Sequence, residues 1–172
     1  REDENSILYG FTIRNGIENK GGGIYIDESS PIIRNCIIEN NTASLNGGGM
    51  YLFRSFALID SCIIRNNGAV KGGGIFTTDE RGAPIFKNCE FTGNNSTGDG
   101  GGVYVDNMDA TFIHCLFNNN HAEDDGGGIY LKRAVSVYVI YGSFYSNNSV
   151  DKGGAIYFEE KSKNSTILNS IF

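Results

Sequence analysis

Residues 126–130 read Gly-Gly-Gly-Ile-Tyr, and this stretch decides the fold because it recurs along the chain. Equivalent stretches begin at Gly21, Gly47, Gly72, Gly100 and Gly153, which gives six copies spaced 26, 25, 28, 26 and 27 residues apart. A fixed period in this range is the signature of a solenoid, in which each repeat buries its apolar face against its neighbours. We expect residues 1–172 to form one such domain, a fragment of a longer solenoid, because the chain stops inside a repeat.

Short apolar segments separated by Gly, Asn, Ser and Asp fill the space between the glycine runs. The segment Cys36-Ile37-Ile38-Glu39-Asn40-Asn41 returns, with changes, at Cys62, Cys89 and Cys115. These patterns are strand and turn signals, and no window has a sustained helical period. The sequence predicts an all-β right-handed parallel β-helix of about six coils of 25–28 residues, with three short strands per coil and almost no helix.

Equivalent residues of a parallel β-helix stack in columns about 4.8 Å apart, so each column should be chemically uniform. Three columns are apolar and are predicted to face the interior. They are Ile24, Met50, Ile75, Val103, Ile129 and Ile156; Ile33, Ile59, Phe86, Phe112, Val139 and Ile167; and Ile38, Ile64, Phe91, Phe117, Phe144 and Phe172. Together they supply a core that no single coil could bury alone.

Charge and hydropathy exclude two kinds of partner. The net charge is −6 and no basic stripe is visible, which argues against nucleic acid. No run of 18 apolar residues is present, so we expect no direct insertion into a membrane.

Two polar columns are predicted to be structural. Stacked amides can hydrogen-bond along a column at one turn, and this is expected for Asn41, Asn67, Asn94, Asn120 and Asn147. A second column contains Cys36, Cys62, Cys89 and Cys115. Buried free thiols are the favoured interpretation of these cysteines, with disulfides or a metal site as alternatives.

An aromatic column is the best candidate for a ligand surface. It follows an inward column by one residue, so strand alternation points it outward. Its members are Tyr25, Tyr51, Phe76, Tyr104, Tyr130 and Tyr157. Such a ladder could stack against sugar rings or another protein. The alternative is that neighbouring rings cover one another and stabilise the sheet.

Acidic residues gather near two consecutive glycine runs, at Asp99, Glu123, Asp124 and Asp125. Carboxylates at one turn could bind Ca²⁺, although a solvated polar turn is the alternative. No other cofactor is indicated. Asp106, Lys132 and Glu159 alternate in sign along another column, which predicts surface charge pairing. His114 occupies a bend column and is interpreted as a turn residue.

The motifs Gly-Gly-(Gly/Ala)-Ile and (Phe/Ile)-x-x-Asn resemble the repeats of polymorphic outer membrane proteins. The unit from Asn35 to Tyr51 is also similar to secreted prokaryotic right-handed β-helix repeat proteins. The resemblance covers essentially the whole chain and implies an extracellular or cell-surface location and a passenger or stalk that acts in adhesion. It implies little about activity, because these repeats are scaffold motifs.

Two classes of function remain after these observations. The favoured one is a non-catalytic structural or adhesive module, whose partner is a polysaccharide or a surface protein of a host or neighbouring cell. One alternative is a polysaccharide-binding module. The other is a carbohydrate-active enzyme, either a polysaccharide lyase or a glycoside hydrolase, whose candidate catalytic acids are Asp99, Asp124 and Asp125. Open coil ends also predict end-to-end self-association.

Overall fold

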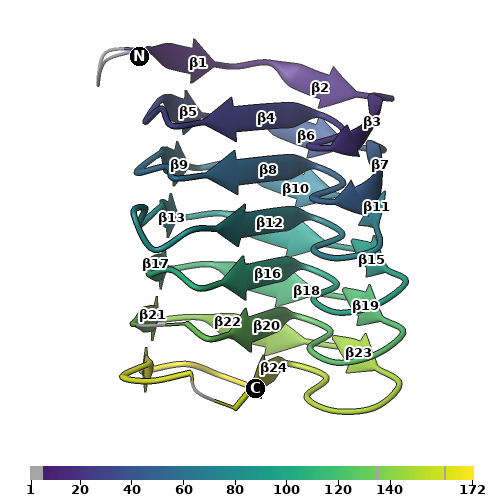
Figure 1. Ribbon diagram of the computed structural model, residues 1–172, viewed down its shortest axis with the longest axis vertical. Helices are drawn as coiled ribbons and strands as arrows, with labels where there is room; N and C mark the ends of the chain where they lie inside the picture. The colour runs from purple at the N-terminus through teal and green to yellow at the C-terminus, as the bar shows by residue number, and fades with distance from the viewer. Residues whose placement is uncertain (1–5, 135, 161) are drawn as a thin grey trace.

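A computed structural model describes residues 6–134, 136–160 and 162–172, and these residues form 25 strands arranged in four parallel sheets (Figure 1). Each coil contributes one strand to each sheet, and successive coils stack along the long axis of the molecule. The prediction of an all-β parallel β-helix is confirmed. The described residues contain no helix long and apolar enough to cross a membrane.

Sheets A and B contain the first and second strands of the chain and their equivalents. Sheet A consists of β1 (Ile7–Tyr9), β5 (Ile32–Arg34), β9 (Leu58–Asp60), β13 (Ile85–Lys87), β17 (Ala110–Ile113), β21 (Val137–Ile140) and β25 (Thr166–Leu168). Sheet B consists of β2 (Thr12–Arg14), β6 (Ile37–Glu39), β10 (Ile63–Arg65), β14 (Glu90–Thr92), β18 (Leu116–Asn118) and β22 (Ser143–Tyr145).

Sheets C and D carry the return segment and the strand after each glycine run. Sheet C consists of β3 (Ile17–Lys20), β7 (Thr42–Asn46), β11 (Gly68–Ala69), β15 (Asn95–Ser96), β19 (His121–Ala122) and β23 (Asn148–Ser149). Sheet D consists of β4 (Ile24–Asp27), β8 (Met50–Phe53), β12 (Ile75–Thr78), β16 (Val103–Asp106), β20 (Ile129–Lys132) and β24 (Ile156–Phe158).

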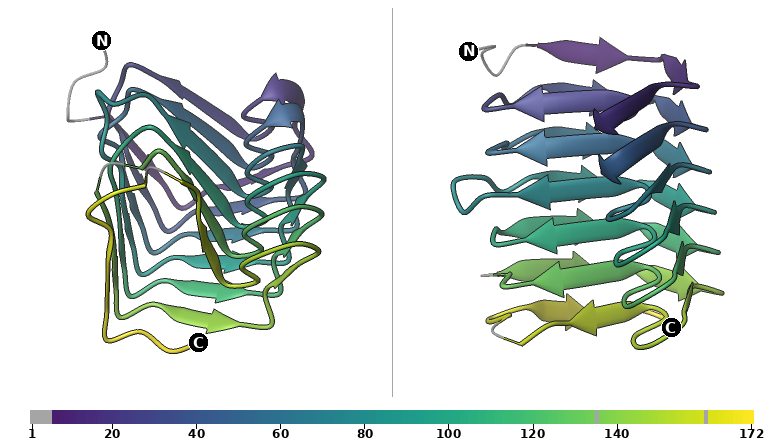
Figure 2. Two further views of the ribbon diagram at one scale, coloured as in Figure 1. Left: turned by 60° about the horizontal axis from the view of Figure 1, so that its bottom comes forward. Right: turned by 45° about the vertical axis from the view of Figure 1, so that its right-hand side comes forward.

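The prediction of three strands per coil was wrong, because the Asn-rich return segment forms the fourth sheet. Strands β11, β15, β19 and β23 are only two residues long, and their Gly, Ala, Asn, Ser and His residues carry little strand propensity. They pair because the coils on either side hold their backbones in register. Figure 2 shows these strands at one corner of the coil, beside the loops that lead to sheet D.

Left-handed backbone conformations turn the corners of each coil. Between sheets A and B, one such residue occurs per coil with φ between +47° and +55°, at Asn35, Ser61, Asn88, His114, Tyr141 and Asn169. Asn tolerates this conformation best among residues with a side chain. The prediction that His114 is a turn residue is confirmed.

The glycine runs are required by close approach between coils. A Cβ on Gly101 would lie 2.5 Å from the backbone oxygen of Gly127 in the next coil. A Cβ on Gly102 would lie 2.5 Å from the oxygen of Gly128. The preceding Gly100 has φ of +69°, which also favours glycine. The motif therefore recurs because backbones of adjacent coils touch there.

The core contains the three predicted apolar columns, except Phe172, which is 66% exposed, and a further inward column with Ile26, Leu52, Val105 and Leu131. The strand registers align their members, for example Ile33 with Ile59, Phe86 with Phe112, and Phe91 with Phe117. Phenylalanine rings within a column stack face to face, with centroids 4.7 Å apart for Phe91 and Phe117. The interior is therefore built from contacts between identical positions of neighbouring coils.

Candidate functional site

The asparagine column forms a continuous hydrogen-bonded ladder. The Asn94 side chain is fully buried. Its Oδ1 accepts from the backbone N–H and the Nδ2 of Asn67, at 3.1 and 3.0 Å. Its Nδ2 donates to the oxygen of Ile64 at 2.9 Å and to Oδ1 of Asn120 at 3.0 Å. The predicted ladder is confirmed, and its amides satisfy backbone groups at the corner between sheets B and C.

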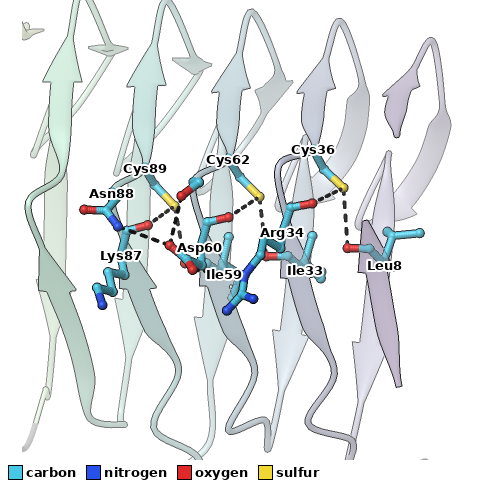
Figure 3. Close-up of polar contacts among 11 residues, drawn as sticks. Leu8, Ile33, Arg34, Cys36, Ile59, Asp60, Cys62, Lys87, Asn88 and Cys89 are labelled. Atoms are coloured by element: carbon cyan, nitrogen blue, oxygen red, sulfur yellow. Dashed lines mark hydrogen bonds and ion pairs between the residues drawn. The ribbon is translucent and has the colours of Figure 1, made fainter. Parts of the chain in front are cut away.

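The cysteine column consists of four free, buried thiols. Figure 3 shows three of them, Cys36, Cys62 and Cys89. The Sγ of Cys62 donates to the oxygen of Asp60 at 3.4 Å and to that of Ile33, in the preceding coil, at 3.5 Å. Contact with the Cys89 thiol and burial raise the pKa of Cys62, which keeps it protonated. The thiols thus act as small core residues that donate to backbone carbonyls of sheet A.

The aromatic column lies outside the core as predicted, but it is not an exposed platform. Tyr51, Phe76, Tyr104 and Tyr130 are only 1–5% exposed and form a separate buried cluster. Their rings stack along the column with centroids 4.7–5.4 Å apart. The structure agrees with the interpretation that neighbouring rings cover one another, because strand spacing brings each ring face against the next ring.

The position of a ring in the column determines how exposed it is. Tyr25, which has a ring neighbour on one side, is 50% exposed. The ammonium groups of Lys20 and Lys71 lie over the rings of Tyr51 and Tyr104, at 5.1 and 5.5 Å from the centroids. Burial is the main cause that raises the pKa of Tyr51 to about 12. The column therefore stabilises the stack of coils.

The four acidic residues do not assemble a metal site. Glu123 and Asp124 are exposed, whereas Asp99 and Asp125 are half-buried. Within residues 6–134, 136–160 and 162–172, no group of three or more His, Cys, Asp or Glu side chains is placed to hold a metal ion. The described side chains therefore do not form the expected calcium cluster.

Asp99 and Asp125 nevertheless form a pair on consecutive coils. The backbone N–H of Asp125 donates to Oδ1 of Asp99 at 3.4 Å. Burial raises the pKa of the Asp99 carboxyl, and the charges of Asp124 and Asp125 add to the rise. One oxygen of Asp125 is buried without a hydrogen-bond partner. Among the described residues, this pair most resembles the two carboxyl groups of an acid–base site.

Charged side chains pair across coils at the end of sheet D. Lys132 lies 3.7 Å from Glu159, as the alternation in sign predicted, whereas Asp106 pairs with Arg133 at 2.7 Å. Arg54 bridges Glu28 in the preceding coil and Asp79 in the following coil. Such surface pairs contribute little stability each, so they do not define a site.

Exposed tyrosines that the repeat pattern did not single out lie on another face. Tyr138, Tyr141 and Tyr145 are 42%, 50% and 67% exposed and belong to one coil. The rings of Tyr141 and His114 stack at 4.9 Å. The signal that could have found them is the absence of charge from residues 136–150. They were missed because their coil is the least regular copy of the motif.

Comparison with known families agrees with this geometry. Residues 2–115 match the model of the right handed beta helix region, so the chain belongs to this family. Residues 114–132 and 142–159 match the Chlamydia polymorphic membrane protein repeat, as the motifs predicted. Together these matches indicate a β-helix module of the kind found in bacterial outer-surface proteins. No curated protein and no solved structure matches the chain.

Proposed function

We propose that the chain is a non-catalytic structural and adhesive module of a protein located outside the cell or on its surface. The main support for this proposal is that the side chains of the amide, thiol and aromatic columns contact residues of the adjacent coils. Their residues hold the solenoid together, and the outer faces are left to vary from coil to coil. A long, rigid body with variable faces suits the presentation of a binding surface to a polysaccharide or to a protein on another cell.

Bead attachment tests this proposal. The chain is coupled to beads, and the attachment of the beads to epithelial cells and to bacterial cells is counted. Attachment that excess soluble chain inhibits supports adhesion, since competition requires a saturable contact. Beads that attach no better than uncoated beads to every cell type would contradict it.

A carbohydrate-active enzyme is the second candidate, and the Asp99–Asp125 pair favours it. A carboxyl with a raised pKa beside a second carboxylate is the arrangement that glycoside hydrolases use for proton donation. The same preparation is incubated with polygalacturonate, mannan and dextran, and new reducing ends are measured. Release that Asp99→Asn abolishes would assign the enzyme; release that persists in this variant would indicate a contaminant.

A further inference from the structure

The outer faces of sheets A and B divide into a charged half and an uncharged half. In the first four strands of each sheet, outward positions carry charged residues, namely Arg14, Arg34, Glu39, Asp60, Arg65, Lys87 and Glu90. From β17 onward the same two sheets carry none: residues 110–120, 136–150 and 164–172 contain no Asp, Glu, Lys or Arg. The chain as a whole is 20% charged, so these three segments depart clearly from its average composition.

We name the outward side chains of β17, β18, β21, β22 and β25, with the corners between them, the uncharged face. Its central coil presents Tyr138 on β21, Tyr141 at the corner and Tyr145 on β22. Each of these rings is at least 42% exposed. Hydroxyl and amide groups occupy the equivalent positions of neighbouring coils, in register with the tyrosines, at Thr111, Thr166 and Asn118.

Tyr141 occupies a backbone conformation that its side chain does not favour. Its φ is +54°, at a corner where Asn88 and Asn169 hold the same position in other coils. A bulky residue in the left-handed region is strained relative to Asn. Strain of this kind is retained where a side chain does something other than stabilise the fold. The ring of Tyr141 stacks on His114 of the preceding coil, and half of the residue remains exposed.

The chemistry of the uncharged face limits what it can bind. Without cations it offers no electrostatic attraction to phosphate, nucleic acid or acidic sugars. The outer side of a parallel sheet is flat, whereas small molecules need a concave pocket. The best-exposed side chains of β21 and β22 are phenols rather than aliphatic groups, since Ile140 is half-buried. Flat aromatic rings beside hydroxyls and amides match the apolar faces and hydroxyl edges of neutral sugars.

We propose that the uncharged face binds a neutral polysaccharide, with the rings of Tyr138, Tyr141 and Tyr145 stacking against sugar units along one polymer chain. This inference rests on the proposed adhesive function and names its ligand class. Contacts run across the coil, from sheet A around the corner to sheet B. An extended polymer can follow this path, because strands rise about 3.3 Å per residue and the tyrosines are three and four residues apart.

The chain itself supplies replacements that each position tolerates. The triple variant Tyr138→Thr, Tyr141→Asn and Tyr145→Asn installs residues that occupy the same columns in neighbouring coils. Tyr9→Ser is the matched control, because Tyr9 is 59% exposed on sheet A but lies on the charged half. Affinity electrophoresis in native gels measures retardation by hydroxyethyl cellulose, mannan and dextran. Polygalacturonate and heparin are the acidic comparison, and thermal unfolding verifies that each variant is folded.

The expected result is that at least one neutral polysaccharide retards the chain and neither acidic polymer does. The triple variant should lose about a hundredfold in affinity, because three aromatic contacts are removed together, while Tyr9→Ser binds as the unaltered chain does. Tyr141→Asn alone should weaken binding without lowering the melting temperature, a combination that a structural role would not give.

Three outcomes would overturn the inference. The first is no retardation by any neutral polymer, and the second is equal retardation of the triple variant. The third is a dimer in sedimentation velocity that the triple variant dissociates in the absence of glycan, which would assign the face to a second copy of the chain. Failure here with bead attachment intact in the triple variant would leave the adhesive proposal standing and remove only the neutral-glycan assignment.

Discussion

Replacement of Asn94 by Ala tests whether the amide ladder holds the coils together. The side chain takes part in four hydrogen bonds, with Asn67, Ile64 and Asn120, and is fully buried. Its removal takes away Oδ1 of Asn94, which is the acceptor for the buried backbone N–H of Asn67. With about 1 kcal/mol for each bond, and more for a buried donor left unpaired, the expected loss of unfolding free energy is about 3–5 kcal/mol. This is a large part of the stability of an ordinary domain.

Asn95→Ala is the matched control, because the neighbouring side chain is exposed and the same residue type is replaced. Its expected cost is below about 0.5 kcal/mol. Urea unfolding followed by far-ultraviolet circular dichroism measures both variants, and hydrogen exchange at the Asn67 amide reports the local effect. Equal losses for the two variants, or unchanged protection of the Asn67 amide, would refute the assignment of the ladder as a main support.

Three further predictions follow from the packing of the coils. Gly101→Ala should lower the melting temperature strongly because its Cβ would collide with backbone of the next coil, whereas Gly68→Ala, whose Cβ meets its nearest atom at 3.9 Å, should leave it nearly unchanged in calorimetry. Because burial raises the pKa of Tyr51 to about 12 from the ordinary value of 10.0, unfolding should release a proton between these pH values, and stability measured by urea unfolding should fall as pH rises from 10 towards 12. The four buried thiols should resist a soluble disulfide reagent in the native chain, and all four should react in urea. The Cys89 thiol and burial raise the pKa of Cys62, so fast reaction of Cys62 in the native chain would contradict the packing.

The sequence determined the repeat, the interior columns and the asparagine ladder. In a solenoid each residue meets mainly the equivalent residue of the next coil, so a column is visible in the sequence as residues of one kind at a regular spacing. Phe91 above Phe117 and Asn94 above Asn120 follow directly from that spacing. The sequence alone also shows that residues 136–150 carry no charge. This feature was missed because it is not repeated in every coil, and a search for repeated positions does not find it.

Tertiary structure alone decided which outward residues are accessible. Alternation along a strand fixes the side of the sheet to which Tyr104 points, but its exposure of 1% depends on rings above and below and on the lysine beside it. The pairing of the two-residue strands in sheet C likewise depends on neighbouring coils. Periodicity gives the direction of a side chain, whereas burial is a property of everything packed around it.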